Sequence, residues 1–119
     1  FGLLGHLLEM MDEALVIDLL PESLPVLAGA REALDAGIRS SMHEANLRSS
    51  GADLEAGDSV AAAPILYDPQ TSGGLLIGVA GAQAQALCDA LHQRGCTDAT
   101  IIGKVSGANL QNGSRVRLV

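Results

Sequence analysis

The sequence lacks the features that carry the commonest kinds of binding site. Only seven of its 119 residues are lysine or arginine, against fourteen aspartates and glutamates, and the net charge is −7. This balance opposes sequence-independent binding to nucleic acid or to anionic lipid. The apolar runs stop well short of the roughly 20 residues that a membrane span requires. We therefore expect no nucleic-acid partner and no transmembrane helix.

Disulfide and metal-binding patterns are also missing. Cys88 and Cys96 are too few and too loosely spaced for a disulfide framework or a C-x-x-C metal pair, and His6, His43 and His92 lie far apart. This predicts two reduced cytoplasmic thiols and no metal site made by this chain alone. Cys88 falls on the apolar side of an expected helix and is predicted to be a small buried residue. Cys96 has no neighbour in sequence that would activate it.

The sequence has no motif for catalysis by itself. There is no G-x-x-x-x-G-K-[ST] phosphate-binding loop, and Ser72 lies in T-S-G-G, which lacks the flanking pattern of a nucleophile elbow. No histidine is near Ser72 in sequence. We assign no catalytic residue to this chain.

The length allows one domain. With 48% hydrophobic residues the chain can form an ordinary core, but a second domain does not fit. The first ten residues, Phe1 to Met10, contain no initiator methionine, signal peptide or targeting pattern. We expect that the sequence was cut from within a longer protein.

The first half of the chain predicts helices and one strand. Apolar residues at helical spacing predict a helix over residues 2–12, and a β-branched run predicts a strand over 14–19. A helix is expected over 25–36, with Pro25 in its first turn and Gly37 as its C-terminal cap. Residues 38–58 are polar, with a short helix expected at 42–49.

The second half predicts a strand, a helix and a closing hairpin. Pro64 argues against a central strand in the apolar run 59–67. The continuous apolar run 75–79 predicts a strand buried on both faces. The remaining elements are a helix over 82–94, with Ala84, Leu87, Cys88 and Leu91 on its apolar face, a strand over 100–105, and an Asn112-Gly113 hairpin turn leading into a strand over 114–119. In that last strand Arg115 and Arg117 alternate with Val116 and Leu118, so one of its faces is expected in solvent or against a partner.

One stretch stands out, D-P-Q-T-S-G-G-L-L at residues 68–76. Pro69 restricts the backbone, while Gly73 and Gly74 allow close approaches that a Cβ would prevent. Between them, Gln70, Thr71 and Ser72 can hydrogen-bond an anion or the surrounding backbone. As residues alone, the stretch is either a polar turn whose side chains cap nearby backbone groups, or a loop whose N–H groups and hydroxyls contact phosphate oxygens.

This stretch and two others resemble motifs of one enzyme family. D-P-Q-T-S-G-G-L-L resembles the signature of the C-terminal domain of selenophosphate synthetases (selenide, water dikinases), in the aminoimidazole ribonucleotide synthetase superfamily. F-G-L-L-G-H at 1–6 is similar to the end of that family's D-x-T-G-F-G-L-L-G-H stretch. Asn46 matches the asparagine of its G-G-T-x-x-N stretch, although Ser41, Met42 and His43 replace the glycines and threonine. The segment 40–46 resembles an S-S-x-x-x-x-N form from versions fused to a flavin-type oxidoreductase.

The resemblance implies a fold and a function. The fold is α+β, a mixed α/β sandwich with a mixed sheet packed against helices, and residues 1–119 are a single C-terminal domain whose N-terminal ATP-binding and catalytic domain is absent. The family makes selenophosphate from selenide and ATP, releasing AMP and phosphate, with Mg²⁺. The implied parent is a cytoplasmic homodimer with ATP, selenide and its own N-terminal domain as partners. The magnesium-binding aspartate of the entry motif would precede Phe1, so the fragment is expected to be inactive alone and to bind no ATP or metal by itself.

The resemblance also implies which residues line the site. The expected wall of the ATP-phosphate site consists of Asp68, Gln70, Thr71, Ser72, Gly73 and Gly74, and residues that would face the site are Gly2, Gly5, His6 and Asn46. From the residues alone, the two N-terminal glycines could equally allow close helix packing, with His6 as a partly exposed polar residue. His43 and Asn46 could equally belong to a surface loop. The sequence leaves open the roles of His43, Cys88 and Cys96.

Two other functions remain open at this point. The chain could belong to another ATP-dependent enzyme of the superfamily, such as the aminoimidazole ribonucleotide, thiamine-phosphate or hydrogenase-maturation enzymes. It could also be a non-enzymatic binding or dimerisation module that keeps the fold. The sequence does not say whether the parent carries Cys or Sec, whether it is a fusion protein, or whether the fragment oligomerises.

Overall fold

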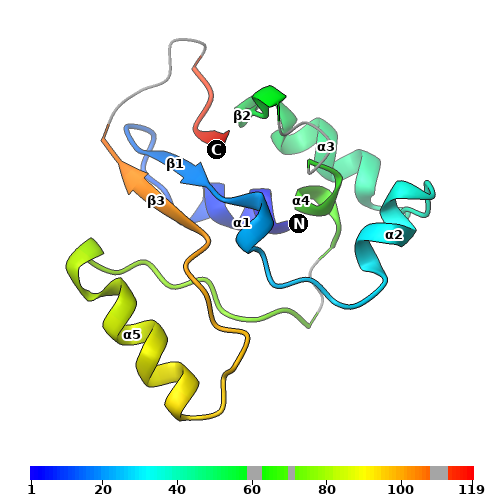
Figure 1. The fold of residues 1–119 in the computed structure, drawn as a ribbon. Helices are drawn as coiled ribbons and strands as arrows, with labels where there is room; N and C mark the ends of the chain where they lie inside the picture. The colour runs from blue at the N-terminus through cyan, green and yellow to red at the C-terminus, as the bar shows by residue number, and fades with distance from the viewer. Residues whose placement is uncertain (59–62, 70–71, 108–112) are drawn as a thin grey trace.

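A mixed four-stranded sheet forms the centre of the molecule (Figure 1). The computed structural model describes residues 1–58, 63–69, 72–107 and 113–119. The strands are β1 (Val16–Leu19), β2 (Leu54–Glu55), β3 (Gly103–Ser106) and β4 (Val116–Leu118). The helices are α1 (Leu3–Glu9), α2 (Ala30–Asp35), α3 (His43–Ser50), α4 (Pro64–Tyr67) and α5 (Gly81–Gln93), with 3₁₀ turns at Pro21–Ser23 and Gly51–Asp53. The predicted α+β class is confirmed.

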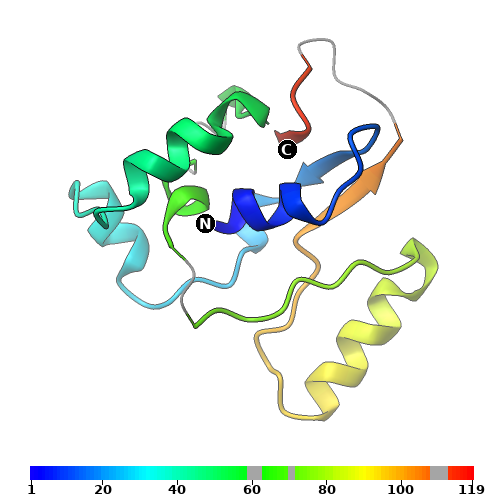
Figure 2. The same ribbon diagram turned by 180° about the vertical axis from the view of Figure 1, so that it is seen from behind.

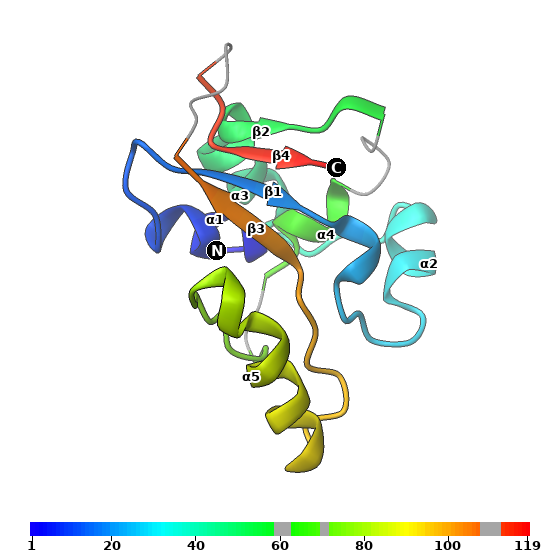
Figure 3. The same ribbon diagram turned by 60° about the vertical axis from the view of Figure 1, so that its left-hand side comes forward.

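Strand β1 lies in the middle of the sheet. It comes from the N-terminal part of the chain and pairs with β4, the last strand. The order is β2-β4-β1-β3, which Figure 3 shows with the strands side by side. β1 pairs with β4 in parallel and with β3 antiparallel, and β4 pairs with β2 in parallel. Within the described parts of the chain, β2 and β3 are therefore the two edges of the sheet.

One face of the sheet carries the hydrophobic core. Helix α1 crosses this face, as Figure 2 shows from behind, and packs against the short helix α4. Leu4, Leu19 and Leu66 are completely buried, and so is Val116 of β4. Burying a leucine side chain contributes on the order of 2 kcal/mol. The contact between α1, α4 and the sheet is therefore the main source of stability that the described core provides.

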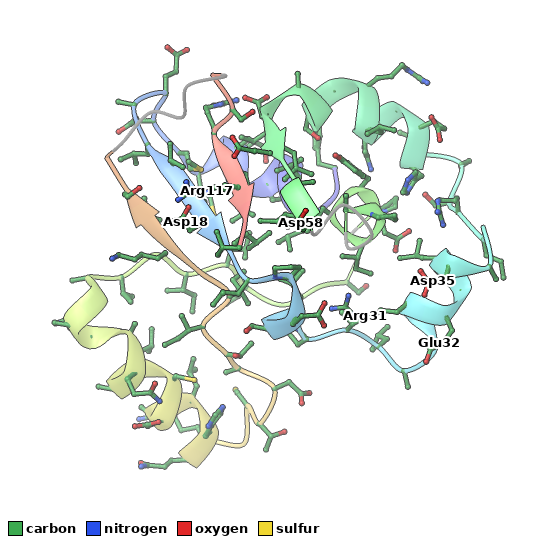
Figure 4. All side chains as sticks on the ribbon, turned by 45° about the horizontal axis from the view of Figure 1, so that its top comes forward. Asp18, Arg31, Glu32, Asp35, Asp58 and Arg117 are labelled. Carbon is green, nitrogen blue, oxygen red and sulfur yellow. The ribbon has the colours of Figure 1, made fainter. Side chains whose placement is uncertain are left out.

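The opposite face of the sheet carries a row of alternating charges. The register places Glu55 beside Arg117, Arg117 beside Asp18, and Asp18 beside Lys104. Figure 4 shows Asp18 and Arg117 pointing toward one another, and the Arg117 Nη2 to Asp18 Oδ1 distance is 2.6 Å. Because these side chains are partly exposed, we expect the pair to contribute less than about 1 kcal/mol. The predicted alternation of the last strand is confirmed, since Val116 and Leu118 are buried.

The expected helices form, with different ends in two cases. The first helix ends at Glu9 rather than residue 12, and α2 begins at Ala30 rather than Pro25. Gly29 has a φ of 83°, which interrupts any helix that starts at Pro25, and Leu27 is exposed. The predicted cap is confirmed, because Gly37 has a φ of 82° and the N–H groups of Gly37 and Ile38 bond to the carbonyls of Leu34 and Ala33.

Two predictions about strand pairing are wrong. β3 and β4 do not form a hairpin, because β1 lies between them and pairs with both. Gly113 has a φ of 78°, but Asn112 of the expected turn lies outside the described residues. The predicted strand 100–105 begins only at Gly103. Residues 75–79 form no strand and are not buried on both faces, since Leu75, Ile77 and Val79 are 88%, 54% and 42% exposed.

Helix α5 agrees with its prediction in position but not in burial. Ala84, Leu87, Cys88 and Leu91 are its less exposed residues, as the pattern predicts, yet the helix has no buried residue. Cys88 is therefore only half-buried, with its Sγ 3.2 Å from the carbonyl oxygen of Ala99. Cys96 is exposed. None of the helices described here is long and apolar enough to cross a membrane.

A substitution at Gly103 tests the β1–β3 ladder. A Cβ at Gly103 would lie 2.6 Å from the carbonyl oxygen of Asp18, whereas a Cβ at Gly107 would have no atom of the described residues within 4 Å. We expect Gly103→Ala to lower the free energy of unfolding by about 1–3 kcal/mol, because the strands must separate to admit the methyl group. Gly107→Ala is the matched control. Denaturant unfolding measures both, and equal midpoints for the two variants would contradict this register.

Candidate functional site

Two motifs that are far apart in sequence meet at one backbone contact. Gly2, in F-G-L-L-G-H, forms an isolated antiparallel bridge with Pro69, in D-P-Q-T-S-G-G. A Cβ at Gly2 would lie 2.3 Å from the carbonyl oxygen of Leu66 and 2.8 Å from the Tyr67 backbone. Only glycine therefore permits α1 to begin directly against the last turn of α4.

Asn46 joins the same assembly from α3. Its buried amide donates a 2.8 Å hydrogen bond from Nδ2 to the carbonyl oxygen of Tyr67. Tyr67 is the last residue of α4, where carbonyl groups have no partner within the helix. The hydroxyl of Ser50 in turn donates to the Asn46 carbonyl at 2.9 Å. Asn46 thus holds the end of α4 at the point where the chain continues into Asp68.

His43 lies behind this junction. The imidazole is 4% exposed and stands edge-on to the Tyr67 ring, with the ring centroids 5.8 Å apart. Its Nδ1 is buried and has no hydrogen-bond partner among the described residues. Burial raises the pKa of Tyr67 above its ordinary value of 10.0, so the phenol stays neutral at physiological pH. His43 and Asn46 are therefore buried residues of α3 that support the junction, rather than parts of a surface loop.

Gly5 and His6 lie beside the junction rather than on the loop. A Cβ at Gly5 would come within 3.0 Å of the Phe1 side chain. His6 Nδ1 is 3.2 Å from Glu9 Oε2 within the same helix, and the His6 side chain is 41% exposed. These contacts fit the interpretation of His6 as a partly exposed polar residue. The contact between Gly2 and the α4 backbone fits the interpretation of Gly2 as a site of close helix packing.

The described residues on the C-terminal side of the loop are exposed. Asp68 is partly buried and extended, with φ −69° and ψ 131°, at the end of α4. Ser72, Gly73 and Gly74 are exposed. A Cβ at Gly74 would meet no atom within 4 Å, and its φ is not positive, so nothing in the described chain requires glycine there. Gln70 and Thr71 of the predicted wall lie outside the described residues.

The described part of the loop offers hydrogen-bond donors. Ser72 offers a hydroxyl, and exposed backbone at Gly73 and Gly74 leaves N–H groups accessible to phosphate oxygens. Among the described residues, no three or more His, Cys, Asp or Glu side chains come together as a metal site.

Sequence reasoning missed the part played by α4. The backbone of Leu66 and Tyr67 forms the surface that Gly2 touches and that Asn46 bonds. The one local signal was Pro64, which starts the helix at a position where its missing N–H costs nothing. Backbone contacts of this kind leave no mark in the side-chain pattern, so the sequence could not identify them.

A family model and curated relatives both match most of this chain. The family model for AIR synthase related protein, C-terminal domain, matches residues 1–113. The chain is 41% identical over 108 residues to a selenide, water dikinase from Clostridioides difficile (strain 630), covering 88% of this chain and 31% of the relative. It is 36% identical to selenide, water dikinase 2 from Peptoclostridium acidaminophilum, with the same coverage of both chains. The chain thus spans about a third of the length of these curated relatives. Since the family model covers nearly all of the sequence, the chain belongs to the family of AIR-synthase-related C-terminal domains.

Proposed function

We propose that this chain is the C-terminal domain of a selenide, water dikinase and forms one wall of the site that binds the phosphates of ATP. The observation that carries the proposal is the Gly2–Pro69 bridge, which joins the two motifs that resemble the family. Relatives that bear the name selenide, water dikinase support the choice of reaction. The parent enzyme makes selenophosphate from selenide and ATP and releases AMP and phosphate.

The contribution of this chain is electrostatic. The hydroxyl of Ser72 and the exposed N–H groups of Gly73 and Gly74 donate hydrogen bonds to phosphate oxygens and so stabilise negative charge as phosphoryl groups are transferred. Gln70 and Thr71 extend this wall, and Asp68 adjoins it. When bound, magnesium neutralises phosphate charge, and its main ligands belong to the parent's N-terminal domain. The parent is a cytoplasmic homodimer.

Two contacts with α4, the helix that precedes the loop, position the loop. Gly2 allows α1 to reach the α4 backbone, and Asn46 fixes the last carbonyl of α4. Both contacts are buried, so they restrict the direction in which Asp68 and Pro69 leave the helix. A loop held in this way loses less conformational freedom when it binds an anion. These residues are positioning residues, and the loop provides the direct contacts.

Replacement of Ser72 tests the direct contact. In the full-length enzyme we expect Ser72→Ala to lower kcat/KM for ATP by about tenfold or more, because a hydrogen bond to a charged group contributes about 1.5–3 kcal/mol. Ser49→Ala, at an exposed position on α3, is the control and is expected to leave the kinetics unchanged. Steady-state assays with varied ATP measure both. Unchanged ATP affinity and turnover in Ser72→Ala would relegate the loop to a structural role.

Replacement of Gly2 tests the positioning of the loop. Gly2→Ala places a methyl group against the α4 backbone, so we expect it to lower the stability by about 1–3 kcal/mol or more and to reduce ATP turnover in the full-length enzyme. Gly81→Ala, where a Cβ meets no atom within 4 Å, is the matched control. Thermal unfolding and turnover are measured on the same samples. A Gly2→Ala enzyme as stable and active as wild type would show that the α1–α4 contact is looser than described.

The isolated chain is expected to have no enzymatic activity. Within its described residues there is no metal-binding cluster, and the sequence has no nucleophile motif. Selenide-dependent consumption of ATP is measured for the 119-residue chain and, as the positive control, for the full-length enzyme. Consumption by the chain alone would overturn the assignment of the reacting groups to the rest of the parent protein.

A further inference from the structure

A cysteine and a histidine of helix α5 lie side by side, outside the candidate loop. Cys88 and His92 are four residues apart, a spacing that puts two side chains on the same face of a helix. The distance from Cys88 Sγ to His92 Nε2 is 3.7 Å. Neither the cysteine spacing nor the histidine spacing predicts a metal site, but this pair combines one residue of each kind.

The chain that follows α5 brings a third polar atom to the same point. The carbonyl oxygen of Ala99 lies 3.2 Å from Cys88 Sγ and 2.6 Å from His92 Nε2. Local hydrogen bonds hold the backbone there, since the Cys96 N–H donates to the Leu91 carbonyl and the Ala99 N–H donates to the Cys96 carbonyl. A thiol, an imidazole and a carbonyl group therefore converge, with their polar atoms no more than 3.7 Å apart.

These three atoms have the spacing and the chemistry of metal ligands. Bonds of about 2.0–2.3 Å to zinc place two ligands of a tetrahedral ion roughly 3.5 Å apart. The distance between Cys88 Sγ and His92 Nε2 already agrees with this spacing, and the Ala99 oxygen needs to move by less than about 1 Å. Thiolate and imidazole are the ligands that zinc and other thiophilic closed-shell ions prefer.

The position is accessible to an ion from solvent. His92 is exposed, and Cys88 is half-buried. Figures 1 and 3 show α5 standing apart from the other helices, attached by two extended segments. No third His, Cys, Asp or Glu side chain of the described residues joins the pair. The carbonyl group of Ala99 thus completes a set of three ligands, and the fourth position of a tetrahedral ion is left to water or to an external ligand.

We propose that Cys88 Sγ, His92 Nε2 and the Ala99 carbonyl oxygen bind one zinc-like, thiophilic metal ion, which ties the end of α5 to the segment that follows it. On binding, Cys88 loses its thiol proton to solvent and the imidazole keeps one proton on Nδ1. Bonds to the ion then replace the two hydrogen bonds to Ala99. Helix α5 has no buried residue, so packing contributes little to its stability, and the ion stabilises the helix and the turn after it. This site does not depend on the proposed function of the candidate loop.

Hydrogen exchange on the full-length enzyme tests the site, with Zn²⁺ as the probe and magnesium held constant. We expect saturating Zn²⁺ to slow amide exchange within residues 88–99 at least tenfold. Exchange in β1 and β4, which pair with one another, is expected to change little and serves as the internal control. Equilibrium dialysis on the same samples measures how many zinc ions each chain binds. Absence of zinc binding, or a change of less than twofold in residues 88–99 at saturation, would overturn the inference.

Variants identify the ligands. Cys88→Ala and His92→Gln are each expected to bind one zinc ion fewer per chain than wild type and to lose the zinc-dependent slowing in residues 88–99. Cys96→Ala, which removes the exposed cysteine of the same segment, is the matched control and is expected to behave as wild type. Exchange in β1 and β4 without zinc reports whether each variant folds. Slowing that persists in folded Cys88→Ala, or that is lost in folded Cys96→Ala, would assign the ion to other ligands and contradict the proposal.

Discussion

The close contact between the start of α1 and the end of α4 organises the rest of the described structure. Gly2 has no side chain, so its backbone lies against Leu66 and Tyr67 and pairs with Pro69. This approach brings Leu4 of α1 and Leu66 of α4 into one buried cluster with the central strands of the sheet. A larger residue at Gly2 would separate the two helices, and both the core and the candidate loop depend on their distance.

The end of α4 also explains why polar side chains of α3 are buried beside it. The amide of Asn46 provides the partner that the last carbonyl of α4 would otherwise lack, and the Ser50 hydroxyl partners Asn46 in turn. An unsatisfied buried carbonyl would cost about 1–3 kcal/mol, so the short helix α4 depends on α3. Three segments that are distant in sequence therefore converge at the base of one loop. His43 is the exception in this cluster, because its buried Nδ1 has no partner and the described structure provides no compensation for it.

Part of this arrangement could be predicted because its causes are local. The spacing of apolar residues placed α1 and α5, and the glycines at 37 and 95 ended helices by adopting positive φ values of 82° and 91°. The resemblance marked residues 1–6, Asn46 and 68–74 as parts of one site, and the structure brings Gly2, Asn46 and Pro69 together at the end of α4. The resemblance did not reveal that Gly2 and Asn46 contact the backbone of α4. Backbone groups are the same in every residue, so a contact with them leaves little trace in the sequence.

What the sequence determined by itself was the set of elements with local causes: the helices α1, α2, α3 and α5, the strand β1, the buried alternation of Val116 and Leu118, and the two motifs of the candidate site. What only the tertiary structure decided was the pairing of strands. Asn112-Gly113 and its flanking residues suggested a hairpin, yet β1 takes the place between β3 and β4. Leu75 to Val79 has the composition of a buried strand and nevertheless lies exposed. A strand pattern describes which side chains could be buried, but hydrogen bonds between strands require a second backbone, and the choice of that partner depends on the whole fold.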